Sequence, residues 1–295
     1  MQIEKPLLII DGNNTLYRAY YSYQKLNNKG KKVSCIFGTP SIVKGLIEKF
    51  KPQETYICWD GKKSKERLRI LPDYKKRTPK LNFDYKDFLY QKGIVMEMFY
   101  LLGIKQIYQW DMEADDNIYF LWRKLRKRNN PIIIISTDKD FNQLINSQTF
   151  VYNTYHNLTL DKKSIKEMKG YTPKQTVDYL TLLGDKSDNI QGYKGIGEKK
   201  AIEFLTKYSS IRNFLSLPEE HSIINKSTLT ELMIKNKYLM DLRFYYKEFI
   251  RGKQKISYFK ENKKPKLNKE GFFKICDEFY IRLFKKSAFL NAFQK

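Results

Sequence analysis

The sequence predicts an α/β fold in which helices cover both faces of a mostly parallel sheet, followed by a helical subdomain. Two short apolar runs, Leu7 to Ile10 and Ile132 to Ile135, suit strands that are buried on both faces. Helix-like segments separate the apolar runs, as the crossover connections of a parallel sheet require. Carboxylates follow the runs, where open α/β sheets place their ligand sites. The pattern therefore predicts an acidic site at one edge of a sheet.

The composition is strongly basic. The 295 residues include 56 Lys and Arg against 32 Asp and Glu, a formal net charge of +24. Such an excess favours a polyanionic partner, with nucleic acid ahead of an acidic membrane surface. Cys35, Cys58 and Cys276 form no CxxC pair, which argues against a structural zinc site. Since no apolar run approaches the roughly 20 residues of a membrane span, we expect a cytoplasmic protein without a membrane partner.

Four predicted strands lead into acidic residues. In chain order they are Leu7 to Ile10 with Asp11, Thr55 to Trp59 with Asp60, Lys105 to Trp110 with Glu113, Asp115 and Asp116, and Ile132 to Ile135 with Asp138 and Asp140. Acidic residues in a first helical turn often complement the helix dipole, but three carboxylates in four positions exceed what capping needs. Alternate residues of an extended exit face one way, so Asp138 and Asp140 can share a site.

The remaining predicted elements complete the two parts. A helix over Thr39 to Phe50, capped by Thr39 or Ser41, joins the first two strands, and a fifth strand spans Phe150 to Asn153. Leucine-rich packing helices are expected over residues 209 to 250, a lysine-rich linker over 251 to 268, and a last helix over Lys269 to Lys286 that docks on the body.

A basic segment without clear periodicity follows Asp60. Its lysines and arginines extend from Lys62 to Lys80, and aromatic residues from Phe83 to Tyr90 follow. The charge alone favours neither of two interpretations, a mobile loop that binds a ligand or a solvent-exposed loop without a binding role. The aromatic residues are core residues by default, although one or two can stack on unpaired bases.

The stretch from Gly184 to Ala201 combines two kinds of ligand chemistry. Asp185 and Asp188 lie three residues apart, which directs both carboxylates toward one point. Gly192, Gly195 and Gly197 then precede a predicted helix, Lys199 to Lys207. Glycine permits close backbone approach, and the free N–H groups of a helix start attract phosphate. The stretch therefore predicts a metal site beside a phosphate clamp.

At these residues the sequence resembles the 5′-nuclease or flap endonuclease superfamily, in particular phage-type 5′–3′ exonucleases and the nuclease domain of bacterial DNA polymerase I. Residues 184 to 199 match its Gly-Asp-x-x-Asp-Asn-Ile-x-Gly-x-x-Gly-Ile-Gly-x-Lys pattern, and Glu113 to Asp116 match its Glu-x-Asp-Asp motif. The resemblance implies a helix–three-turn–helix at about 184 to 208 that grips duplex DNA. It also implies a helical arch over about 61 to 100, through which single-stranded DNA passes.

The resemblance also assigns the carboxylates to divalent metal ions. Nine clustered carboxylates repel one another unless cations compensate, and oxygen ligands favour Mg²⁺ or Mn²⁺. Two ions about 4 Å apart would activate water and stabilise the leaving oxygen. K⁺ is a further ion expected at the helix–three-turn–helix. The implied ligands are Asp11, Asp60, Glu113, Asp115, Asp116, Asp138 and Asp140, with Asp185 and Asp188 completing a more distant position.

Basic and glycine residues are implied to act on the DNA. Lys75, Arg67 and Arg18 offset charge on the transferring phosphate. Thr78 stands where the superfamily has an arginine, one residue after Arg77. The residues expected to bind DNA are Tyr74, Lys75, Arg77, Gly192, Gly195, Gly197, Lys199 and Lys200.

The resemblance therefore implies a structure-specific 5′-nuclease of DNA replication or repair, which we expect to be a monomer that acts on flap, pseudo-Y or nicked DNA and on RNA in RNA–DNA hybrids. The expected division is a nuclease core over residues 1 to 170 and a helical DNA-binding subdomain over 171 to 295. Since no polymerase domain follows, we expect a free-standing enzyme of a bacterial cell or a phage-infected host. Two alternatives are a PIN-type ribonuclease, which would not need the Gly184 to Lys199 pattern, and a DNA-junction-binding protein without catalysis.

Overall fold

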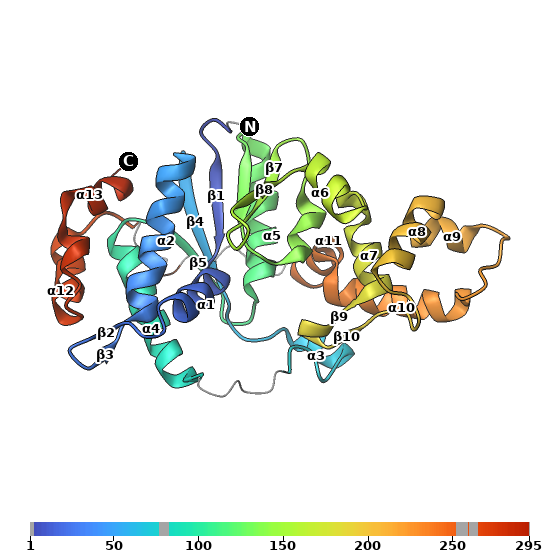
Figure 1. The fold of residues 1–295 in the computed structure, drawn as a ribbon, viewed down its shortest axis with the longest axis horizontal. Coiled ribbons are helices and arrows are strands. Elements are labelled where there is room, and N and C mark those ends of the chain that lie inside the picture. Colours follow the sequence, from blue (N-terminus) through green and yellow to red (C-terminus); the bar gives the residue numbers. More distant parts are fainter. Residues whose placement is uncertain (1–2, 77–82, 252–258, 260–264, 295) are drawn as a thin grey trace. The chain divides into compact units, whose positions relative to one another are not determined.

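A computed structural model describes residues 3–76, 83–251, 259 and 265–294 (Figure 1). The chain forms two compact units. The first contains Met1–Lys62, Lys80–Ser136 and Ile256–Lys295, and the second contains Lys63–Pro79 and Thr137–Lys255. The division into a nuclease core and a DNA-binding subdomain near residue 170 stays a prediction. Arg77 and most of the expected linker lie outside the described residues. Within the described part of the chain, no helix is both long enough and apolar enough to cross a membrane.

The first unit is built on four parallel strands in the order β5-β4-β1-β6. Ile10 of β1 pairs with Ile57 of β4 on one side and with Ile135 of β6 on the other. Leu7 to Ile10 are fully buried, as expected of a strand covered on both faces. The strands are β1 (Leu7–Asp11), β4 (Glu54–Trp59), β5 (Lys105–Tyr108) and β6 (Ile132–Ile135).

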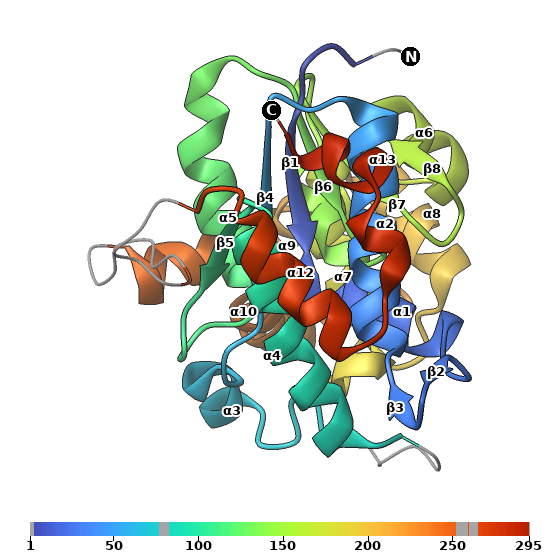
Figure 2. The same ribbon diagram turned by 90° about the vertical axis from the view of Figure 1, so that its left-hand side faces the viewer.

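Helices lie on both sides of these strands, which confirms the predicted fold class. Figure 2 shows α5 on one side of β1 and β4, and α2 on the other. The helices of this unit are α1 (Gly12–Ser22), α2 (Ser34–Phe50), α4 (Tyr85–Leu101), α5 (Ala114–Leu125), η1 (Arg126–Arg128), α12 (Lys269–Glu278), η6 (Arg282–Lys285), α13 (Ser287–Leu290) and η7 (Asn291–Phe293).

Helix α2 begins at Ser34, five residues before the predicted start at Thr39. Its N-cap residue, Val33, makes no side-chain capping bond. Instead, the fully buried Gln91 of α4 accepts hydrogen bonds from the backbone N–H groups of Cys35 (2.8 Å) and Ile36 (3.4 Å). A cap supplied by another helix leaves no local signal, so the sequence suggested the wrong start.

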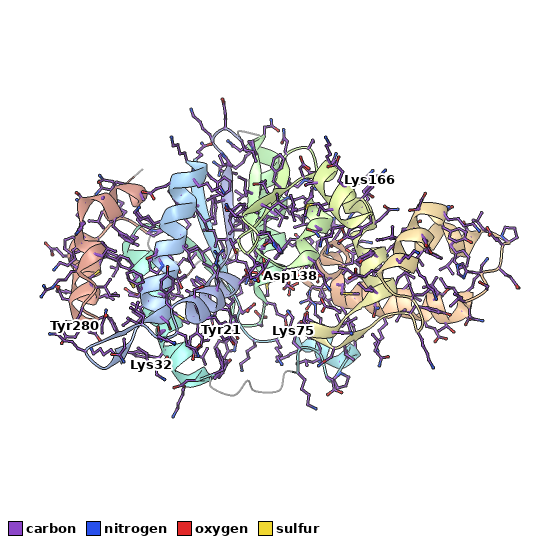
Figure 3. All side chains as sticks on the ribbon, viewed as in Figure 1. Tyr21, Lys32, Lys75, Asp138, Lys166 and Tyr280 are labelled. Carbon is purple, nitrogen blue, oxygen red and sulfur yellow. The ribbon has the colours of Figure 1, made fainter. Side chains whose placement is uncertain are left out.

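The C-terminal helix is shorter than predicted, because α12 ends at Glu278 and Tyr280 has a φ of 56°. The following residues fold back, and Phe284 stacks on Phe37 of α2 with ring centroids 5.3 Å apart. A hairpin of β2 (Asn27–Asn28) and β3 (Lys31–Lys32) also meets this region, since the Asn28 amide donates to the Phe279 carbonyl (3.0 Å). Figure 3 labels Lys32 and Tyr280 there.

The second unit is mainly helical. Its strands β7 (Thr149–Asn153) and β8 (Leu158–Leu160) pair antiparallel, and β8 was not predicted. The other elements are α3 (Lys65–Ile70), η2 (Lys139–Leu144), α6 (Lys162–Lys169), η3 (Pro173–Gln175), α7 (Thr176–Leu183), β9 (Gly184–Asp185), η4 (Lys186–Asp188), β10 (Ile190–Gln191), α8 (Glu198–Tyr208), α9 (Ile211–Ser216), α10 (Lys226–Met240), α11 (Leu242–Tyr245) and the π-helical turn η5 (Tyr246–Ile250).

Candidate metal centre and nucleic-acid interface

Asp11 and Asp60 lie at the carboxyl ends of neighbouring parallel strands. Asp11 pairs in register with Cys58, two residues before Asp60. The carboxylate of Asp11 accepts hydrogen bonds from the Asn14 N–H and from the Ser136 hydroxyl, both at 2.9 Å. The carboxylate of Asp60 accepts the Ala114 N–H at 2.6 Å. Both side chains are therefore held at one edge of the first unit's sheet, as the sequence predicted.

Glu113, Asp115 and Asp116, which we call the α5 cluster, lie at the start of helix α5. One carboxylate oxygen from each lies within 4.8 Å of the other two. Glu113 and Asp116 are buried, with 3% and 2% of their surfaces exposed. The positive end of the helix dipole stabilises such groups, but three carboxylates at this distance repel one another in a poorly solvated site. A set made only of carboxylate oxygens suits a hard divalent cation.

Asp138 and Asp140 follow strand β6 but adopt a different geometry from the predicted extended exit. Asp138 is the N-cap of the 3₁₀ helix η2, and its carboxylate accepts the Asp140 N–H at 2.9 Å. Alternation along a strand is therefore not what brings these residues together. Asp140 is 8% exposed. The bond fixes the Asp138 carboxylate against the backbone of Asp140 at the start of this turn.

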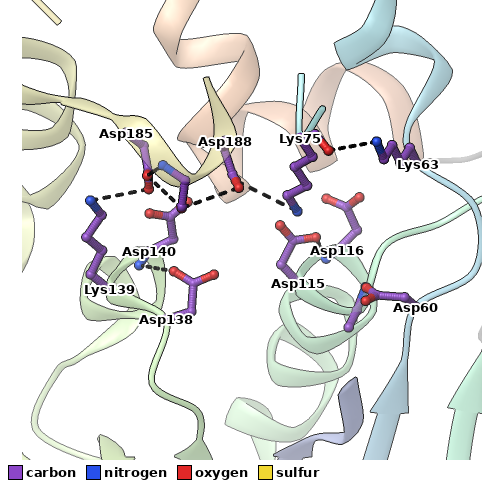
Figure 4. Close-up of polar contacts among 12 residues, drawn as sticks. Asp60, Lys63, Lys75, Asp115, Asp116, Asp138, Lys139, Asp140, Asp185 and Asp188 are labelled. Atoms are coloured by element: carbon purple, nitrogen blue, oxygen red, sulfur yellow. Dashed lines mark hydrogen bonds and ion pairs between the residues drawn. The ribbon is translucent and has the colours of Figure 1, made fainter. Parts of the chain in front are cut away.

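Asp185 and Asp188 lie in a short turn of the second unit, where lysines compensate their charge (Figure 4). The Asp185 carboxylate accepts hydrogen bonds from the N–H (2.8 Å) and hydroxyl (2.7 Å) of Ser187 and lies 3.3 Å from the Lys139 ammonium. Burial alone would raise the pKa of Asp185, but these contacts hold it below the ordinary value. Asp188 pairs with Lys75 at 3.9 Å.

The turn that carries Lys75 is fastened to the Asp188 segment. The backbone N–H of Lys75, which has a φ of 50°, donates to the Asp188 carbonyl at 3.1 Å. The Asn189 amide donates to the carbonyls of Asp73 and Lys76, both at 2.8 Å. These bonds join segments more than a hundred residues apart in sequence, and they fix the ammonium of Lys75 beside the carboxylate of Asp188.

Arg67 and Tyr74 are buried, with exposed fractions of 1% and 2%. The Arg67 guanidinium lies 3.9 Å from the ring centroid of Tyr245 and 5.9 Å from that of Tyr74. Such burial suits residues that support the Lys75 turn, and their direct action on DNA stays a prediction. Arg18, in contrast, lies on the exposed side of α1.

The three glycines of the Gly192 to Gly197 loop differ in why their positions suit a glycine. A Cβ at Gly192 would lie 2.3 Å from the Leu183 backbone, so this glycine allows two chain segments to approach. Gly195 has a φ of 83° and an open surrounding. Gly197 is the N-cap of α8, and because glycine has no side chain, it leaves the first N–H groups of this helix without a side-chain cap. With Lys199 and Lys200 exposed in the next turn, this helix start has the character of a phosphate site.

Two lysines not predicted from the sequence contact acidic residues of the predicted site, one at a carboxylate and one at a main-chain carbonyl. Lys139 pairs with Asp185, and Lys92 of α4 donates to the main-chain carbonyl of Asp60 at 2.8 Å. Lys139 had a detectable signal, since it separates two aspartates of one motif. Lys92 had none, because one lysine in a helical pattern is normally solvated.

The chain matches two family models over most of its length. Residues 6–171 match the 5′-3′ exonuclease N-terminal resolvase-like domain, and residues 171–248 match the 5′-3′ exonuclease C-terminal SAM fold. A 5′-3′ exonuclease of Aquifex aeolicus is 34% identical over 212 residues, which are 72% of each chain. DNA polymerase I of Bacillus subtilis is 32% identical over 230 residues, 75% of this chain and 26% of the polymerase.

Solved structures share the fold. A flap endonuclease of bacteriophage T5, determined with DNA and metal ions, superposes with a TM-score of 0.71 at 20% identity and covers 98% of this chain and 100% of its own. The catalytic core of Rad2 with DNA substrate has a TM-score of 0.55 at 17% identity, and the match covers 94% of this chain and 88% of that core. The family models and the identity to curated exonucleases show that this chain belongs to the 5′-3′ exonuclease family.

Proposed function

We propose that this chain is a monomeric, structure-specific 5′-nuclease that hydrolyses phosphodiesters of flap, pseudo-Y and nicked DNA. The observation that carries the proposal is the α5 cluster, a set of three neighbouring carboxylates, two of them buried, in a member of the 5′-3′ exonuclease family. Action on the RNA strand of an RNA–DNA hybrid is part of the same proposal, because the phosphate groups that the protein would contact are common to RNA and DNA strands.

The α5 cluster, with Asp11 and Asp60, would hold Mg²⁺ or Mn²⁺, and Asp138, Asp140, Asp185 and Asp188 would hold a further ion. When bound, such ions lower the pKa of a water molecule and offset charge on the reacting phosphate. The protein's own part is to keep these oxygens oriented. Ser136 holds the Asp11 carboxylate, and the Ala114 N–H holds that of Asp60. Lys75 would contribute positive charge to the phosphate while Asp188 restrains it.

Binding of the DNA would rest on the α8 start and the basic surface. The uncapped N–H groups after Gly197, with Lys199 and Lys200, would hold backbone phosphates, and K⁺ would bind at the same helix–three-turn–helix. The net charge of +24 supports a polyanionic substrate. Affinity should therefore fall steeply as salt rises.

Cleavage of a 5′-labelled flap substrate, with Mg²⁺ and then with EDTA, tests this proposal. Release of the flap near the junction, only with metal and with little cutting of blunt duplex, is the expected result. Tight binding without cleavage in Mg²⁺ or Mn²⁺ would point instead to a junction-binding protein. Preference for single-stranded RNA over flap DNA would point to a ribonuclease.

A further inference from the structure

Trp110 is an exposed tryptophan in the segment that leads into the α5 cluster. It has 62% of its surface exposed, whereas Trp59 is fully buried and Trp122 is 6% exposed. The sequence placed Trp110 at the end of a strand, but β5 ends at Tyr108 and Trp110 belongs to the following turn. Most of its indole ring is therefore accessible to solvent in the segment just before Glu113.

The turn that carries Trp110 is fastened to the segment that follows Asp60. The Lys62 N–H donates to the Trp110 carbonyl at 2.6 Å, and the Gly61 N–H donates to the Met112 carbonyl at 2.8 Å. A Cβ at Gly61 would lie 2.1 Å from the Gln109 carbonyl oxygen, so the two backbones touch. Together with the Ala114 to Asp60 bond, these contacts hold Trp110 at a fixed position relative to Asp60 and the α5 cluster.

Lys62 also contributes its side chain to this position. Its ammonium lies 4.6 Å from the centroid of the Trp110 ring, within the range of a cation–π contact. An exposed ring next to a cation offers both parts of a contact to a single-stranded nucleotide, because the base can stack on the ring while the cation attracts a phosphate. An exposed apolar patch for another protein would not need the cation.

We propose that Trp110 and Lys62 form a subsite for one unpaired nucleotide of the substrate, with the indole stacked on the base and the ammonium on its phosphate. The proposal rests on the proposed function, since it assumes a single-stranded DNA segment near the α5 cluster. Stacking on an aromatic ring accepts any base. The subsite therefore adds affinity for unpaired DNA without adding sequence preference.

A thermodynamic cycle that removes either the base or the ring tests the proposal. Flap DNA with a single abasic residue, scanned through the unpaired strand, is bound in EDTA so that no cleavage occurs. For the wild-type protein, one abasic position should weaken binding by roughly 5- to 100-fold, the usual effect of losing one stacked base. In Trp110→Ala the same abasic position should change the Kd less than twofold, while Trp110→Phe should keep most of the wild-type response.

Two further variants make the result specific. Lys62→Met should reduce the slope of log Kd against log salt by about 0.7, the value for one contact to a single strand. Tyr155→Ala removes an aromatic residue with 81% exposure on the turn after β7, and it should leave the abasic response unchanged. Equal abasic losses in wild type and Trp110→Ala would overturn the subsite. Because binding is measured without metal, these outcomes are independent of whether the flap is cleaved.

Discussion

Lys92 donates a hydrogen bond of 2.8 Å to the main-chain carbonyl oxygen of Asp60, the residue that follows strand β4. The ammonium also lies 5.7 Å from the ring centroid of Trp59 and 5.8 Å from that of Tyr108. Burial lowers the pKa of Lys92, and the nearby charge of Asp60 opposes this shift. A half-buried cation thus fixes the backbone from which a predicted metal ligand projects.

Replacing Lys92 should therefore affect metal use more than folding. In Lys92→Met the Asp60 carbonyl loses its donor, so the carboxylate is less well held, while the cost of burying an ammonium also disappears. We expect the Mg²⁺ concentration for half-maximal cleavage to rise several-fold, with a change in unfolding free energy below about 1.5 kcal/mol. Lys92→Arg should restore part of the Mg²⁺ affinity. An unchanged Mg²⁺ titration in Lys92→Met would show that the contact is only structural.

The α5 cluster should destabilise the metal-free protein. Its carboxylates repel one another, so Asp115→Asn should raise the thermal midpoint in EDTA, and Mg²⁺ or Mn²⁺ should raise that of the wild type. The variant should gain much less from the metal. Asp111→Asn, an acidic residue two positions before Glu113, is a matched control and should keep the wild-type response. A metal shift that survives in Asp115→Asn would contradict the assignment of Asp115.

Glu54 should contribute stability that is lost in acid. Burial alone would raise its pKa, but hydrogen bonds from Arg128, from Lys105 at 2.5 Å and from Tyr56 at 2.6 Å lower the pKa to about 2. Because the folded pKa lies below the unfolded value of 4.5, this stabilisation is complete above pH 4.5 and disappears as the pH falls toward 2.

Glu54→Gln should consequently cost roughly 1–2 kcal/mol at pH 7, after allowance for solvent screening of a partly exposed group. Urea unfolding at pH 7 and pH 3.5 measures the difference, which should shrink at the lower pH. A loss of equal size at both pH values would mean that the ion pairs are not its source.

The two ends of the Gly184 to Gly197 stretch should respond differently to alanine. At Gly184 φ is 78° and a Cβ would lie 2.4 Å from the Gly192 nitrogen, so Gly184→Ala should destabilise the protein by at least about 2 kcal/mol. At Gly197 φ is −99° and no atom lies within 4 Å of a Cβ, so Gly197→Ala should cost less than about 1 kcal/mol.

Urea unfolding measures the loss of stability in each variant. Binding of DNA then shows whether a variant that still folds has lost its contact to the phosphate. If backbone approach at the α8 start serves the phosphate, Gly197→Ala should weaken binding of nicked duplex while remaining folded. Wild-type affinity in Gly197→Ala would remove this glycine from the predicted interface.

The fold was largely predictable because its signals are local. Ile132 to Ile135 match β6, and the carboxylates after the strands identified the edge on which Asp11 and Asp60 lie. The failures come from contacts made across the chain. Gln91 caps α2 from another helix, and Asn189 holds the turn of Asp73 and Lys76 from more than a hundred residues away. Neither partner leaves a signal at the element that it stabilises.

The types of residue in the site were predictable, but the buried contacts around them were not. The spacing of Glu113, Asp115 and Asp116 predicted an acidic cluster, and their oxygens lie within 4.8 Å of one another. The buried position of Arg67 was not predictable, since arginines are rarely buried and its aromatic neighbour Tyr245 belongs to a distant helix.

Cleavage of a 5′-labelled flap DNA by the wild type and by Asp116→Asn, with Mg²⁺ or with EDTA, tests the metal-dependent nuclease most directly. The wild type should release the flap near the junction only when Mg²⁺ is present. Asp116→Asn should bind the DNA with similar affinity but cleave it at least about a hundredfold more slowly, the size of effect that loss of a positioned catalytic group produces. Full activity of Asp116→Asn, or cleavage by the wild type in EDTA, would contradict the assignment of the α5 cluster.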